Sequence, residues 1–87
     1  MSTIWKYKLS VGENEINLPS YNQILTVQLQ NEEPYVWVLL DPKEKTYPML
    51  FDVYGTGHTI EDSQFKHYIG TWQDGPHVWH LFKTYYK

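Results

Sequence analysis

The fold is decided by a segment that reads Ile24-Leu25-Thr26-Val27-Gln28-Leu29-Gln30. Leu25, Val27 and Leu29 alternate with polar residues, so an extended chain would have one apolar face and one polar face. A period of two is typical of a β-strand that buries one face. The segment therefore predicts a strand over residues 24–30.

Similar patterns on both sides of this segment predict further strands. Working outward, they cover residues 35–40, 47–54, 15–18, 3–9, 65–73 and 78–85. The run over 35–40 is apolar almost throughout, which favours a central strand covered on both faces. Residues 10–14 and 31–34 are expected to be turns, and the Asp-Gly step in Asp74-Gly75-Pro76-His77 predicts a hairpin.

These segments together predict the architecture. We expect one mainly β domain over residues 1–87, with six to seven short, mostly antiparallel strands closed into a small sandwich or barrel. At most one short helical turn is expected, near residues 59–65, with Thr59 as its N-cap.

Composition narrows the function classes. The 87 residues include 4 Trp, 8 Tyr and 3 Phe but no Cys, Ala or Arg, and the formal net charge is −3. An acidic chain without Arg is not expected to bind nucleic acid, and a chain without Cys has no thiolate metal site or cysteine nucleophile. No apolar run approaches the roughly 20 residues of a membrane helix, and a signal-peptide pattern is missing. We therefore expect a cytoplasmic protein with no membrane partner.

The histidines do not predict a metal site. His77 and His80 are three residues apart, so on a strand their side chains would point to opposite faces and could not bind one ion. We expect no metal and no cofactor. Catalysis by His58 as a base, with Glu61 or Asp62 orienting it, is an alternative that lacks a recognisable nucleophile.

The best local candidate for a ligand site is Tyr54-Gly55-Thr56-Gly57-His58. Its two glycines allow positive φ angles, and exposed N–H groups in such a loop can bind an anion. A tight turn at the end of a strand explains the same residues. If the loop binds a ligand, aromatic side chains such as Trp37 or Trp72 are the expected walls of the pocket.

The aromatic residues are too many for a small core to hide them all. Alternation places some of them at the surface, where Tyr and Trp commonly anchor protein interfaces. A core rich in Trp is the alternative. The candidates for surface positions are Tyr35, Trp37, Tyr68, Trp72, Tyr85 and Tyr86.

Several segments, in order along the chain, resemble a family of small uncharacterised proteins encoded by phages and bacterial genomes. The matching segments are Ile4-Trp5-Lys6-Tyr7, Ile24-Leu25-Thr26-Val27-Gln28, Trp37-Val38-Leu39-Leu40-Asp41, Tyr54-Gly55-Thr56-Gly57-His58, Tyr68-Ile69-Gly70-Thr71 and Val78-Trp79-His80-Leu81-Phe82. The resemblance carries no activity with it. It implies a context in which small acidic proteins act stoichiometrically on host components.

The leading hypothesis is thus a non-enzymatic, phage-type binding protein whose partner is a host protein or a small-molecule ligand. In the phage context it would act as an anti-defence inhibitor. The first alternative is a module that sequesters a nucleotide or a small signal at residues 54–58. Such a module would be a homo-oligomer, because interfaces between subunits deepen the shallow pockets of a short chain. The second alternative is a small hydrolase-like enzyme that uses His58.

Overall fold

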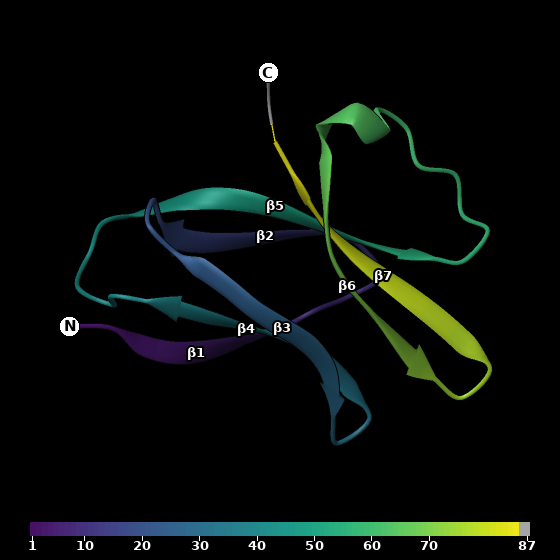
Figure 1. Cartoon of the computed structure of the whole chain (residues 1–87), viewed down its shortest axis with the longest axis horizontal. Helices are drawn as coiled ribbons and strands as arrows, with labels where there is room; N and C mark the ends of the chain where they lie inside the picture. The colour runs from purple at the N-terminus through teal and green to yellow at the C-terminus, as the bar shows by residue number, and fades with distance from the viewer. Residues whose placement is uncertain (86–87) are drawn as a thin grey trace.

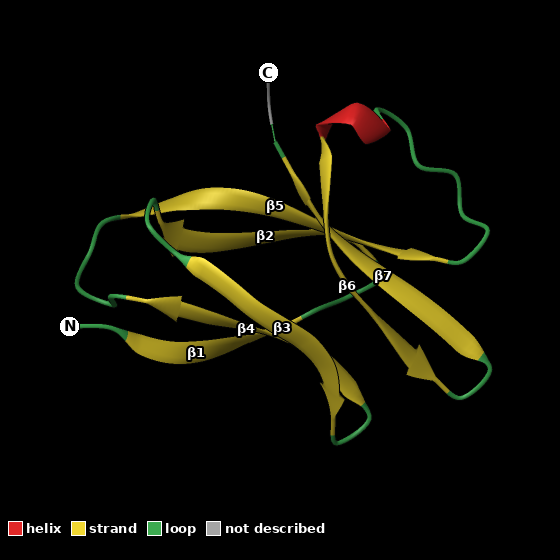
Figure 2. Cartoon of the chain, viewed as in Figure 1, coloured by secondary structure: helices red, strands yellow, loops and turns green. Residues whose placement is uncertain are grey.

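The sequence folds into short strands joined by tight connections. The structure, a computed structural model, describes residues 1–85, and within that range it contains seven strands and one 3-10 helix (Figures 1 and 2). The strands are β1 (Thr3–Lys8), β2 (Gly12–Pro19), β3 (Gln23–Gln30), β4 (Glu33–Leu40), β5 (Thr46–Gly55), β6 (Lys66–Asp74) and β7 (His77–Thr84), and the helix is η1 (Ser63–Phe65). The prediction of a mainly β chain is confirmed.

The strands form two antiparallel sheets. One sheet has the order β1-β4-β3 and the other β2-β5-β7-β6, and every paired neighbour runs antiparallel. The first sheet packs against the second, with β3 in contact with β6 (Figure 1). The sheets do not close into a barrel, so of the two predicted architectures the sandwich is correct.

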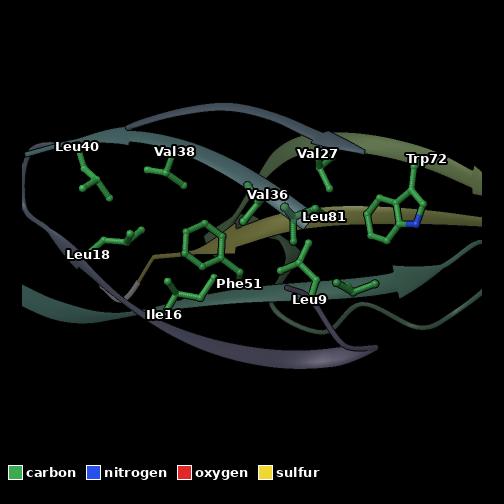
Figure 3. Close-up of a cluster of buried hydrophobic side chains, with 11 residues drawn as sticks. Leu9, Ile16, Leu18, Val27, Val36, Val38, Leu40, Phe51, Trp72 and Leu81 are labelled. Carbon is green, nitrogen blue, oxygen red and sulfur yellow. The ribbon is translucent and has the colours of Figure 1, made fainter. Parts of the chain in front are cut away.

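The core lies between the sheets. Its largest fully enclosed side chains are Phe51, Leu18 and Leu81. Figure 3 shows the cluster, with Leu18 and Leu40 near one end and Trp72 at the other. Each such Leu, Val or Phe side chain stabilises the fold by about 1.5–3 kcal/mol when fully buried. The buried apolar residues are Leu9, Ile16, Leu18, Val27, Val36, Val38, Leu40, Phe51, Val53, Trp72 and Leu81.

A β-bulge interrupts the alternation that predicted β3. The pairing of β3 with β4 shifts register between Ile24 and Thr26, which leaves the intervening residue unpaired. Ile24 and Val27 face the core, whereas Leu25 is 41% exposed. The prediction that Leu25 shares the buried face with Val27 is wrong because the bulge adds one residue to this strand.

β4 is the central strand of its sheet, but only one of its faces is buried. Val36, Val38 and Leu40 point into the core. Tyr35, Trp37 and Leu39 alternate with them and are partly exposed on the opposite face. The central position is confirmed, and the expectation that both faces would be covered is wrong, because no described element packs over the outer face.

The connections differ in detail from the predicted turns. β2 begins at Gly12, so the expected turn over residues 10–14 is shorter; Gly12 has a φ of 91°, which favours glycine. η1 falls within the predicted region, but its N-cap is Asp62 in a left-handed conformation and not Thr59. No helix in the described part of the chain is long and apolar enough to cross a membrane.

Both hairpins that flank one end of the sandwich have two-residue turns. Asn31 and Glu32 connect β3 to β4 with φ angles of 52° and 67°, as a type I′ turn requires. Gly75 and Pro76 connect β6 to β7, where Gly75 has a φ of 60°. Because Pro76 cannot adopt a positive φ, the second turn is of type II′ and not the type I′ turn that an Asp-Gly pair would form.

Candidate functional site

The segment Tyr54–His58 forms a tight turn at the end of β5. The His58 N–H donates to the Gly55 carbonyl at 3.0 Å, which closes a four-residue turn. Gly57 occupies its third position with a φ of 93°, the geometry of a type II turn. The Gly55 N–H donates to His58 Nδ1 at 3.0 Å, so the imidazole fastens the turn from its other side.

Close packing explains why residue 55 of this turn is a glycine. A Cβ atom on Gly55 would lie 3.1 Å from the His58 ring and 3.1 Å from the Trp79 ring. The two rings meet edge to face, with centroids 6.1 Å apart. The Thr56 N–H is also occupied, since it donates to the Val78 carbonyl at 3.1 Å. Three N–H groups that an anion-binding loop would offer, those of Gly55, Thr56 and His58, are therefore already used within the fold.

The expected aromatic walls lie elsewhere in the sandwich. Trp37 is on the outer face of the β1-β4-β3 sheet. Trp72 is only 7% exposed and faces the core between the sheets. Neither lines a cavity with residues 54–58, whose aromatic neighbour is Trp79 of β7. The structure thus does not bring Trp37 or Trp72 together with this loop, because the side on which each strand presents its Trp depends on the sheet pairing.

Some of the six candidate aromatic residues lie at the surface, as alternation predicts. Tyr68 and Tyr85 are exposed, and Tyr35 and Trp37 are partly exposed. Trp72 is buried and belongs to the core. Tyr86 lies outside the described residues.

A chain of polar side chains crosses the outer face of the β2-β5-β7-β6 sheet. His80 Nε2 lies 2.8 Å from Thr56 Oγ1, and His80 Nδ1 lies 3.0 Å from Thr71 Oγ1. The Tyr68 hydroxyl extends the chain, 2.6 Å from Thr71 Oγ1. A hydroxyl beside an imidazole is the geometry of an activated nucleophile, but here a second hydroxyl and not a carboxylate orients the imidazole. Sequence reasoning missed this group because its members meet only through strand pairing.

The alternative catalytic assignment to His58 has a different geometry. Nδ1 of His58 accepts the Gly55 N–H, and the other side of the ring faces Trp79. Among residues 1–85, His58 has no hydrogen bond to Glu61 or Asp62. The carboxylates therefore do not orient the imidazole in the way that the alternative required.

The loop after this turn covers a cavity of about 580 Å³ over β5 and β7. A buried ion pair lies at its base, where Lys66 Nζ is 2.8 Å from Asp52 Oδ2 and 2.8 Å from Thr84 Oγ1. Thr84 also donates to Asp52. Burial acts to lower the pKa of Lys66, but interactions with Asp52 and Tyr54 outweigh it and raise that pKa above its ordinary value. Lys66 stays charged, and Asp52 compensates that charge.

The remaining charges of this cavity are negative. Glu61 and Asp62 line it and form no ion pair within residues 1–85. Since the positive charge of Lys66 is already compensated by Asp52, the cavity disfavours a phosphate group. Of the described residues predicted to bind a ligand, Tyr54 alone lines this cavity, together with Glu61 and Asp62 from the alternative catalytic assignment.

An uncovered aromatic surface lies on the other sheet. The rings of Tyr35 and Trp37 are 6.0 Å apart on β4, and Lys6 Nζ lies 4.5 Å from the Tyr35 ring centre. Ile4 is 54% exposed on the neighbouring strand. We call this surface the β1-β4-β3 outer face; it consists of Ile4, Lys6, Leu25, Tyr35, Trp37 and Leu39.

Metal ligands do not gather anywhere in the described part of the chain. No group of three or more His, Asp or Glu side chains there could hold a metal ion. His80 lies with Thr56 and Thr71, while the His77 ring packs against Trp79, so the prediction that they face opposite sides is confirmed.

Comparison with known proteins gives one match. No curated protein and no solved structure matches the chain. A family model covers it from end to end, which agrees with the resemblance to an uncharacterised family. The chain belongs to the family described as Domain of unknown function (DUF7352), which matches residues 1–87.

Proposed function

We propose that this protein is a non-enzymatic binding protein that forms a stoichiometric complex with another protein. The observation that carries the proposal is the β1-β4-β3 outer face, where Trp37 and Tyr35 lie at the centre of a sheet surface. Trp and Tyr are the residues that most often dominate binding energy at protein interfaces. Ile4 and Leu25 extend the apolar area at the two flanking strands.

The resemblance to proteins of phages and bacterial genomes supports a host protein as the partner. In that setting the protein acts in the host cytoplasm as an inhibitor, for example of a defence system. A sheet face with a few large aromatic residues suits such a role better than it suits catalysis, because it offers contact area without a reaction centre.

The test is capture of the partner from lysate of the host, with and without infection, using tagged protein and a variant of the outer face. Ile4→Glu combined with Leu25→Glu places two charges in the proposed interface, at exposed positions where substitutions usually change stability by less than about 0.5 kcal/mol. Tyr21→Glu is the matched control, because Tyr21 is 91% exposed and lies in a loop outside this face.

We expect native mass spectrometry to report a complex of fixed stoichiometry with the natural sequence and the control, and its loss with the double variant. Capture of nothing above background would contradict the proposal. So would a complex that the double variant retains fully.

Sequestration of a nucleotide or small signal ranks second. The cavity near Tyr54 is large enough for a small ligand, but Glu61 and Asp62 would repel a phosphate. Native mass spectrometry on protein purified from infected cells distinguishes the two functions. A homo-oligomer with added mass of nucleotide size would favour sequestration.

A small hydrolase-like activity ranks third. The observation in its favour is the 2.8 Å contact of Thr56 with His80, and not the His58 assignment made from sequence. If hydrolysis of an ester substrate were found, its loss in Thr56→Val and its retention in His58→Ala would assign the activity to the Thr56–His80 pair.

A further inference from the structure

A second cavity opens at the end of the sandwich where three connections meet. It measures about 330 Å³, within the range of small-ligand sites. Figure 1 shows the β3–β4 turn and the β6–β7 hairpin at this end. We call it the Trp72–Trp79 pocket; its lining includes Leu9, Val53, Trp72, Trp79, Glu32 and Asp74.

The indole N–H of Trp72 has no hydrogen-bond partner within residues 1–85, although Trp72 is only 7% exposed. Buried Trp side chains usually find a partner for this group. No fully enclosed nitrogen or oxygen of a described side chain lacks a partner. The Trp72 nitrogen is therefore not fully enclosed in the core, and Trp72 is one of the residues that line the pocket. In Figure 3 it lies on the side of the ring turned away from Phe51 and Val36.

The rim of the pocket carries an uncompensated negative charge. Lys8 is its cation, and it pairs with Glu33 at 2.8 Å. The hydrogen bond and charge of Glu33 raise the pKa of Lys8, so Lys8 is charged at neutral pH and faces the Glu33 carboxylate. Glu32 and Asp74 form no ion pair in the described range, which leaves two free carboxylates beside the two indole rings.

The backbone conformation of Glu32 is unusual for a residue other than glycine. Glu32 occupies the second position of a type I′ turn with a φ of 67°, where glycine is strongly preferred. A residue other than glycine in this conformation costs stability, and such strain is found most often at functional sites. Here the side chain supplies one of the two free carboxylates.

We propose that the Trp72–Trp79 pocket binds an organic cation, an alkylammonium or guanidinium group, between the Trp79 ring and the carboxylates of Glu32 and Asp74, while the Trp72 N–H donates to an acceptor atom of the same ligand. Trp is the aromatic residue that binds cations most strongly through its ring face. Carboxylates add charge-assisted hydrogen bonds to ammonium and guanidinium groups. The site goes beyond the proposed protein-binding function and uses side chains other than those of the β1-β4-β3 outer face.

The test follows the four Trp indole N–H signals by proton–nitrogen NMR during titration. The Trp72 signal is assigned as the one missing from a Trp72→Phe variant. The probes are N-acetyl-arginine amide and choline as cations, N-acetyl-citrulline amide as the neutral match, and AMP as an anion. We expect the two cations to shift the Trp72 signal with saturation in the millimolar range, and the neutral and anionic probes to leave it in place.

The matched pair of variants separates a local site from general attraction to an acidic protein. Glu32→Gln with Asp74→Asn removes two charges at the rim and should weaken cation binding at least about tenfold. Glu15→Gln with Glu44→Gln removes two exposed charges, one from β2 and one from the β4–β5 connection at the opposite end of β4 from the pocket, and should change cation binding less than about twofold.

The outcomes of the titration are distinct. Tighter binding of N-acetyl-arginine amide assigns the site to a basic side chain of a partner, and tighter binding of choline assigns it to a free small cation. The proposal is overturned if neither cation shifts the Trp72 signal, if AMP binds as well as they do, or if both double variants weaken binding equally. None of these results depends on whether the β1-β4-β3 outer face captures a protein.

Discussion

Gly70 tests the sandwich packing most directly. It lies on β6, and a Cβ atom at this position would be 2.6 Å from Cγ1 of Val27 on β3, where the two sheets meet. Carbon atoms pack at about 3.5–4.0 Å, so Gly70→Ala would create an overlap of roughly 1 Å. Val27 is buried and β-branched, with few alternative rotamers, so it cannot move aside at low cost. Such overpacking usually costs about 1–3 kcal/mol.

That cost is large for this chain. At about 0.05–0.15 kcal/mol per residue, a domain of this size has a free energy of unfolding of roughly 4–13 kcal/mol. A loss of about 2 kcal/mol would lower Tm by roughly 8–16 °C. Urea unfolding followed by Trp fluorescence, and thermal unfolding followed by circular dichroism, both measure the change. Gln28→Ala is the control, since it alters an exposed residue next to Val27 and should change stability by less than about 0.5 kcal/mol.

A double-mutant cycle attributes the cost to the contact itself. Val27→Ala removes the methyl group that the new Cβ would meet, so the double variant should be at least about 1 kcal/mol more stable than the two single effects predict. A neutral Gly70→Ala variant, or single effects that simply add, would refute the close approach of β3 to β6.

The remaining predictions concern other local features of the fold. Lys66→Met should cost about 3–5 kcal/mol because it leaves the Asp52 carboxylate buried without its partner, whereas Lys66→Met with Asp52→Leu should recover most of the loss in urea unfolding. The pKa of Lys66 is raised in the folded state, so the charged Lys66 stabilises the fold below its unfolded pKa of about 10.4. This stabilisation is lost as the pH rises through the folded pKa. Alkaline titration should therefore destabilise the natural sequence more than the double variant. Glu32→Gly should raise the free energy of unfolding by about 1 kcal/mol and at the same time weaken cation binding. If Glu32 had no role in binding, only the free energy of unfolding would change. Gly57→Ala should cost about 1 kcal/mol or more in thermal unfolding, because its φ of 93° is strained for alanine, and Gly57→Asn should cost less.

The sequence predicts where the strands lie because burial of one sheet face imposes alternation on the residues. All seven strands overlap a predicted segment for this reason. Alternation cannot predict an inserted residue, and Leu25 shows the consequence: its apolar side chain fits the pattern, yet the bulge turns it outward. The start of β2 was not predicted, because a glycine usually indicates a turn. Gly12 nevertheless occupies the first position of the strand with a positive φ.

The candidate site was predictable only where it is local. The turn over residues 54–58 depends on glycine conformation, which is a property of the segment itself, and the structure contains that turn. Its partners were not predictable, because Val78 and Trp79 reach it through the pairing of β5 with β7. The contact of His80 with Thr56 and Thr71 has the same origin, since it joins a loop and two strands that the chain order does not bring together.

Strand pairing assembles the Trp72–Trp79 pocket from distant segments, and one residue in the sequence still indicates it. Its residues come from the β1–β2 and β3–β4 connections and from five different strands, so no single segment could reveal it. One residue nevertheless departs from what the local fold requires. A two-residue turn that begins with Asn31 favours glycine at its second position. This chain has Glu32 there, at a conformational cost of about 1–2 kcal/mol. A marginally stable chain loses a notable share of its stability to such a choice, and within residues 1–85 the Glu32 carboxylate forms no hydrogen bond or ion pair in return. The position of this carboxylate beside two indole rings is therefore better explained by a ligand than by folding.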